Sequence, residues 1–99
     1  MDGSAQAADL HEEIRRLRVR VSGLSTAALE GGAREAVREA LARLADLTAE
    51  GRPVPDLGDR VLADQLVVLL SDCLPEYGAA ETTTARGLDI ARELRRALP

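Results

Sequence analysis

The chain of 99 residues contains neither Phe nor Trp, and Tyr77 is its single aromatic residue. A large aromatic side chain buries about 150–250 Å² when it enters a core. Leu, Val and Ala must therefore fill the interior, and they bury less area per residue. Because 45% of the residues are hydrophobic and 30% are charged, the composition is typical of one globular domain. Dimerisation is an expected way to cover the apolar surface that so small a core leaves.

Residues that bind metals or act as nucleophiles are equally scarce, because the sequence has one His and one Cys. A metal site needs several converging His, Cys or carboxylate ligands, and a nucleophile needs a base beside it. Neither a Gly-rich phosphate loop nor a dinucleotide fingerprint is present. We therefore predict a protein that is not an enzyme, with no catalytic residue, no cofactor and no metal. Cys73 lies on the apolar side of a predicted helix and is expected to be buried.

Lys and Asn are also absent, so all 13 basic residues are Arg. Lys, Asn and Phe share AT-rich codons, and a GC-rich genome, expected to be bacterial, explains their joint scarcity better than selection for guanidinium chemistry. The net charge of −4 disfavours general attraction to nucleic acids or anionic membranes. No apolar run approaches the roughly 20 residues of a membrane span, and the acidic first ten residues do not resemble a signal peptide. We expect a cytoplasmic location and no membrane contact.

Apolar residues recur at the period of an α-helix in four segments, and no segment alternates like a β-strand. The predicted helices cover about residues 5–23, 27–49, 57–74 and 80–98. With the short connections between them, this pattern predicts an all-α protein, a compact antiparallel four-helix bundle that forms a single domain over residues 1–99. Dimerisation would complete the bundle if apolar stripes are left uncovered.

The connections contain the residues that begin and end helices. The Ser25-Thr26 pair offers an N-cap for the second helix. Gly31-Gly32, near the start of that helix, is expected to kink it, because two glycines cost about 1 kcal/mol each in a helix interior. The segment 51–55, Gly-Arg-Pro-Val-Pro, is typical of a linker. Asp56 or Asp59 then offers an N-cap for the third helix.

The most apolar segment of the chain is residues 61–74. At about 100° per residue, Leu62, Leu66 and Leu69 share one side of a helix. Val61 and Val68, seven residues apart, lie nearly in line on another side. The segment is either a central helix with neighbours on two sides, or a helix whose second stripe contacts another molecule.

The first predicted helix combines an apolar seam with a basic stripe. The apolar residues from Leu10 to Leu24 are spaced 4-3-4-3, as in a coiled coil. Arg15, Arg18 and Val19 point away from that seam, within a stretch that also contains Arg16 and Arg20. In heptad terms, Glu13 and Arg18 occupy the g and e positions that pair across a parallel coiled-coil dimer.

These observations favour a small helical protein-protein interaction or adaptor protein, which binds a protein partner or itself as a homodimer. The expected contact residues are Arg15, Arg18, Val19, Val61 and Val68. The alternative is a small nucleic-acid-associated regulator that uses the Arg15–Arg20 stripe. That alternative lacks the basic domain and the stacking aromatic residues that such proteins usually have.

Overall fold

The structure, a computed structural model, describes residues 3–99. Its long helices are α1 (Gly3–Ser22), α3 (Arg34–Thr48), α4 (Leu62–Ser71) and α5 (Glu81–Ala97). The shorter elements are α2 (Thr26–Ala28), the π-helical turn η1 (Leu29–Ala33), and the 3-10 turns η2 (Asp59–Val61) and η3 (Pro75–Tyr77). Between residues 3 and 99 there is no β-strand. The predicted all-α class is confirmed.

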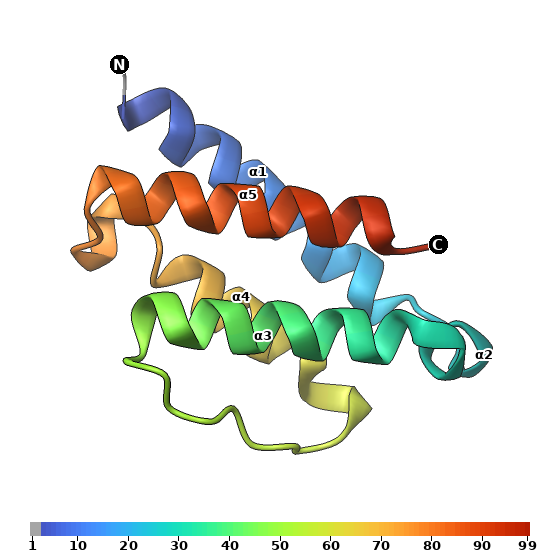
Figure 1. The fold of residues 1–99 in the computed structure, drawn as a ribbon. Coiled ribbons are helices and arrows are strands. Elements are labelled where there is room, and N and C mark those ends of the chain that lie inside the picture. The colour runs from blue at the N-terminus through green and yellow to red at the C-terminus, as the bar shows by residue number, and fades with distance from the viewer. Residues whose placement is uncertain (1–2) are drawn as a thin grey trace.

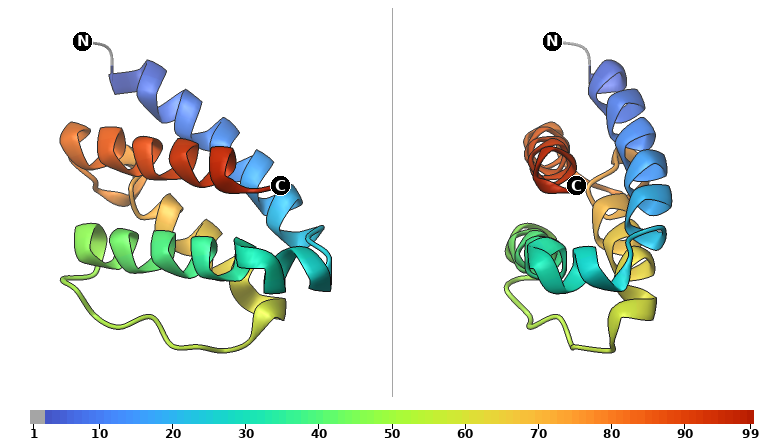
Figure 2. Two further views of the ribbon diagram at one scale, coloured as in Figure 1. Left: turned by 45° about the vertical axis from the view of Figure 1, so that its right-hand side comes forward. Right: turned by 90° about the vertical axis from the view of Figure 1, so that its right-hand side faces the viewer.

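The four long helices pack compactly in two layers (Figure 1). One layer is formed by α1 and α4 and the other by α5 and α3, and each helix also packs on one helix of the opposite layer (Figure 2). Helices that follow each other in the chain, α1 and α3 or α4 and α5, therefore occupy opposite corners. The predicted four-helix bundle is confirmed, and it is antiparallel within each layer. Between the layers, α1 and α5 run in the same direction, as do α3 and α4.

The connection between α3 and α4 explains why these two helices are parallel. Residues 49–61 can span about 40 Å when extended, whereas α3, with 15 residues, is about 22 Å long. The connection is therefore long enough to return along the whole length of α3, below the bundle in Figure 1. As a result α4 begins at the same end of the bundle as α3.

The kink before α3 is where the sequence predicts it. Gly32 has a φ of 121°, a conformation that glycine adopts without steric cost and other residues rarely adopt. Upstream, the Ser25 hydroxyl accepts a hydrogen bond from the Ala28 N–H at 3.0 Å, which satisfies one of the free donors of α2. The predicted kink at Gly31-Gly32 and the predicted Ser25 cap are both confirmed.

The prediction that Asp56 or Asp59 caps the third helix is wrong, because no side chain caps η2 or α4. Asp59 instead accepts hydrogen bonds from Arg34 of α3 at 2.8 and 2.7 Å. Asp56 accepts the Gly58 N–H at 3.0 Å and pairs with Arg38 of α3. An arginine and a carboxylate can form two parallel charge-assisted hydrogen bonds, as Arg34 and Asp59 do, whereas a cap residue bonds only to backbone N–H groups. The two aspartates therefore hold the connection against α3.

The core lies between the two layers and contains the apolar residues that the helical periods turn inward. Its fully buried large side chains are Leu10, Leu17, Val37, Leu41, Leu44, Leu62, Leu66, Leu70 and Leu74. Small residues bring the backbones close: a Cβ atom on Gly87 of α5 would lie 2.7 Å from both Cβ and Sγ of Cys73. Cys73 is buried as predicted, and its burial raises the pKa of the thiol to about 11. The thiol is therefore neutral at physiological pH.

Candidate functional site

The five residues predicted to form a contact surface all lie on the layer made by α1 and α4. Val19 and Val68 are strongly exposed, at 72% and 59%. Arg15 and Arg18 are exposed, and Val61, in η2 at the start of α4, is half-buried. The helix α4 packs on both α1 and α3, so it has neighbours on two sides. Its outer stripe still faces water at Val68.

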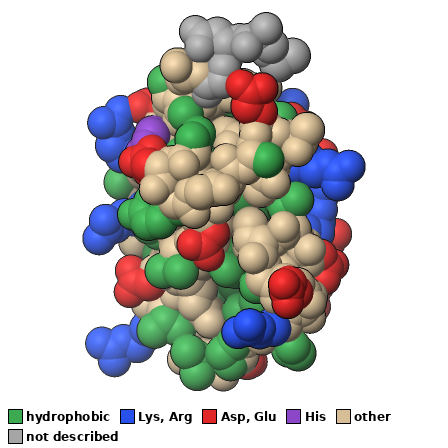
Figure 3. Space-filling view, turned by 90° about the vertical axis from the view of Figure 1, so that its left-hand side faces the viewer, with side chains coloured by type: hydrophobic (Ala, Val, Ile, Leu, Met, Phe, Trp, Pro, Cys, Tyr) green, Lys and Arg blue, Asp and Glu red, His purple; other side chains and the backbone are tan. Residues whose placement is uncertain are grey.

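A groove of about 350 Å³, which we call the linker groove, opens beside Val68. It lies between α4, the end of α3 and residues 52–55 of the connection, and its apolar lining includes Ala45, Ala49, Val54, Pro55, Val68 and Leu69. The side chain of Gln65 positions the connection, because Nε2 donates to the carbonyl oxygen of Pro55 at 3.0 Å. In the view of Figure 3, hydrophobic side chains gather toward the bottom, where the connection runs. The groove has the apolar character of a site for a hydrophobic side chain.

A second groove, of about 580 Å³, runs between α1 and α4, and we call it the α1/α4 groove. Ile14 of α1 and Val67 of α4 are among its apolar lining residues, and Arg15 and Arg18 stand at its border. His11, also part of the lining, has its Nε2 atom 2.9 Å from Oε1 of Glu76, just after α4. The beginning of α1 therefore lies beside the end of α4, as expected for antiparallel neighbours.

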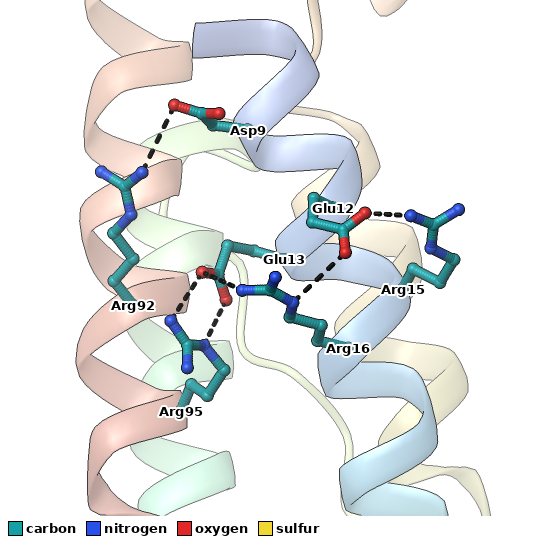
Figure 4. A network of polar contacts seen from close by, with 7 residues as sticks. All are labelled: Asp9, Glu12, Glu13, Arg15, Arg16, Arg92 and Arg95. Atoms are coloured by element: carbon teal, nitrogen blue, oxygen red, sulfur yellow. Dashed lines mark hydrogen bonds and ion pairs between the residues drawn. The ribbon is translucent and has the colours of Figure 1, made fainter.

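Two arginines of the Arg15–Arg20 stripe are paired along their own helix (Figure 4). Arg15 forms an ion pair with Glu12, three residues earlier. The Nε atom of Arg16 lies 3.2 Å from the same carboxylate. Such pairs on an exposed helix face are partly neutralised, which weakens the field that the stripe presents to an anion.

The other two arginines of the stripe, Arg18 and Arg20, do not pair along α1. Arg20 reaches the end of the chain, where its Nε and an NH₂ group donate to the main-chain oxygen of Pro99 at 3.0 and 2.6 Å. Arg18 is exposed and forms no ion pair with any residue from 3 to 99. Arg18 is thus the member of the stripe whose guanidinium charge is available to a partner.

Glu13 is a polar residue of the core that the sequence reasoning missed. It is only 4% exposed, and its carboxylate accepts two hydrogen bonds from Arg95 of α5, at 2.7 and 3.0 Å (Figure 4). This contact raises the pKa of Arg95. The pairing of Glu13 with Arg18 across a parallel coiled-coil dimer is therefore wrong, because the seam of α1 is buried inside one chain. The sequence feature that indicates the burial of Glu13 is its position three residues after Leu10, on the same helix face.

Acidic residues on α4 and just after it are available as well. Asp64 and Asp72 are exposed, and neither forms an ion pair within the described part of the chain. On the opposite layer the exposed charges of α3 and α5 are partly matched: Arg43 lies 2.6 Å from Glu93 and lowers the pKa of that carboxyl. The α1/α4 layer therefore combines exposed valines with unpaired charges of both signs.

Residues 3–99 offer neither a metal centre nor a membrane span. No group of three or more His, Cys, Asp or Glu side chains is arranged to hold a metal ion there. No helix in that range has both the length and the hydropathy needed to cross a membrane.

Comparisons with family models, with curated proteins and with solved structures find no match for this chain. The surface itself is therefore the basis for assigning a function. The α1/α4 layer holds the linker groove beside Val68 and the unpaired charges of Arg18 and Asp64.

Proposed function

We propose that this chain is a small helical interaction protein, not an enzyme, that binds a protein partner through the α1/α4 layer. The observation that carries the proposal is Val68, which is 59% exposed and lines an apolar groove of about 350 Å³. Apolar surface in contact with water costs about 25 cal/mol per Å² relative to buried surface. A partner that covers Val68 and fills the groove removes that cost.

Charge on the same layer supports the proposal. Arg18 and Asp64 are exposed and unpaired, and they border the two grooves of this layer. Protein interfaces commonly surround an apolar centre with a polar rim. Charges at the rim contribute to the orientation of a partner and to the rate of association more than to affinity. This layer therefore has the parts of an interface, with valines inside and charges around them.

The nucleic-acid alternative draws no support from the geometry. Arg15 and Arg16 of the stripe are paired with Glu12, and Arg20 is bonded to Pro99. A phosphate backbone would have to displace these contacts, and the chain has a net charge of −4.

The proposal is tested by site-specific photo-crosslinking in the cell that makes the protein. A photoreactive amino acid replaces Val68 in one version, and it replaces Arg86, an exposed residue of α5 in the opposite layer, in the control. We expect a discrete crosslinked protein species from position 68 and none from position 86. Absence of any product from position 68, in protein that is present and folded, would contradict the proposal.

A further inference from the structure

The chemistry of the α1/α4 layer points to the identity of the partner, on the assumption that the proposed interaction function holds. Arg18 is an unpaired cation on α1, and Asp64 is an unpaired anion on α4. Both lie on the same layer, on neighbouring helices, yet they form no ion pair with each other. A surface that holds a basic and an acidic edge side by side is complementary to a copy of itself turned by a half-rotation.

The two charges also lie at similar heights along the bundle. His11 of α1 contacts Glu76 beyond the end of α4, and Arg18 shares the α1/α4 groove with Val67 in the middle of α4. Moving along α1 from His11 to Arg18 thus corresponds to moving back along α4. Counted from the His11–Glu76 contact, Arg18 is level with about residue 69, and Asp64 lies about 7.5 Å further back along α4. That difference is within the reach of an arginine side chain.

We propose that two copies of this chain form a symmetric dimer, in which α1 of each copy lies on α4 of the other. The twofold axis runs parallel to the helices, outside the exposed face of the α1/α4 layer. Rotation about it leaves the position of every residue along the helix direction unchanged. It places α1 of one copy in front of the antiparallel α4 of the other. Arg18 of each copy then meets Asp64 of the second copy, and the contact occurs twice.

Apolar side chains lie between these two charged contacts. Ile14 and Val67 line the α1/α4 groove, which the second copy covers. Val19, exposed at 72%, and Val68, exposed at 59%, lie on the exposed faces of α1 and α4 and are covered within the contact. Burial of this surface provides the favourable free energy, and the two charge pairs determine the orientation of the copies.

The available area is in the range of a weak dimer. The 20 residues of α1 and the 10 residues of α4 form two helices about 30 and 15 Å long and about 10 Å wide. Their flat footprint is about 450 Å², and the relief of the side chains increases the accessible surface above this value. Stable complexes bury about 800 Å² per partner, and smaller interfaces belong to weak or transient complexes.

The decisive experiment exchanges charges between the two positions and measures solution mass by light scattering across a concentration series. We expect the unmodified chain to dimerise. Arg18→Asp alone and Asp64→Arg alone should each weaken the homodimer about tenfold or more, because each creates two contacts between like charges. An equimolar mixture of the two single variants should form a mixed dimer, in which both contacts again join opposite charges. The double variant should form a homodimer.

Arg86→Asp is the matched control, because Arg86 is an exposed arginine of α5 in the opposite layer. It should leave the dimer unchanged, and circular dichroism of every variant should show the helicity of the unmodified protein. A mixture of the single variants that stays as weakly associated as each variant alone overturns the proposal, as does an unmodified chain that stays monomeric at all concentrations.

The same data separate this inference from the proposed function. A monomeric chain that still yields a crosslink from position 68 to a different protein retains the interaction function and rejects the symmetric dimer. A chain that yields no crosslink to any protein rejects both. A crosslinked product with twice the mass of the chain supports both.

Discussion

At the scale of single residues, the structure shows how tertiary contacts redirect charged side chains. The sequence places Glu30 and Glu39 four residues before Arg34 and Arg43, a spacing that predicts pairs along one helix. Arg34 instead contacts Asp59, and Arg43 contacts Glu93. The local spacing is correct for Glu12 and Arg16, which do pair. The difference arises because α3 has other elements beside it that carry carboxylates, and these compete for its arginines.

Gly87 supports a stability prediction at the same scale. Gly87→Ala should lower the free energy of unfolding by about 1–3 kcal/mol, because overpacking forces neighbours to move and the new Cβ would lie 2.7 Å from two atoms of Cys73. Gly31→Ala is the control, since no atom lies within 4 Å of its added Cβ and its φ is not positive. That change should be neutral or should stabilise the protein by up to about 1 kcal/mol.

Urea unfolding followed by circular dichroism measures both variants. Equal midpoints for Gly87→Ala and the unmodified chain would show that α5 can move away from Cys73 at no cost, contrary to the close packing described here.

At the scale of elements, the connection between α3 and α4 is organised by ion pairs instead of a helix cap. Arg34 lowers the pKa of Asp59, and the Gly58 N–H, followed by Arg38, lowers the pKa of Asp56. A carboxyl whose pKa is lower in the folded state stabilises that state above its ordinary pKa of about 3.9. This contribution is lost as the pH falls through the lowered pKa. The connection should therefore loosen from α3 only in strong acid.

Carboxyl NMR titration tests this assignment. In the unmodified chain, the midpoint of Asp59 should lie below the ordinary value for aspartate. Arg34→Gln should move that midpoint upward toward the ordinary value, because it removes the main cause of the shift. Arg60→Gln is the control: Arg60 forms no ion pair among residues 3–99, so the midpoint should not move. An unchanged midpoint in Arg34→Gln would mean that the pair does not form in solution.

At the scale of the whole molecule, the α1/α4 layer differs from the α3/α5 layer in what it leaves exposed. Val19 and Val68, the two strongly exposed valines, lie on the former. The charged groove of the latter is lined by residues of both signs, among them the paired Arg43 and Glu93. Two of the four strongly exposed large hydrophobic residues therefore lie on this layer, and the other two, Leu57 and Tyr77, lie in the connection and in η3.

Val68→Asp tests whether that surface serves assembly. Because Val68 is 59% exposed, we expect the variant to keep its helicity by circular dichroism. Its solution mass should be that of a monomer at concentrations where the unmodified chain associates, because a carboxylate cannot be buried without a partner. Arg86→Asp, at an exposed position of α5, should change neither measurement. Global loss of helicity in Val68→Asp would instead assign Val68 to the core of the monomer.

The sequence alone determined the features that depend on neighbours a few residues away. The four helical segments, the inward residues such as Leu17 and Leu44, the kink at Gly32 and the Ser25 cap all follow from helical period, glycine conformation and capping chemistry. Each of these depends on contacts within one or two helical turns. Such contacts are nearly the same whatever the rest of the chain does.

Only the tertiary structure decided which distant groups meet. It placed α3 parallel to α4, buried Glu13 against Arg95, used Asp59 to hold Arg34, and left Arg18 unpaired on the same layer as Asp64. These outcomes depend on the path of the 49–61 connection and on the positions of helices far apart in sequence. A charged side chain pairs with the nearest available opposite charge, and that distance is set by how the helices pack, which no local pattern encodes.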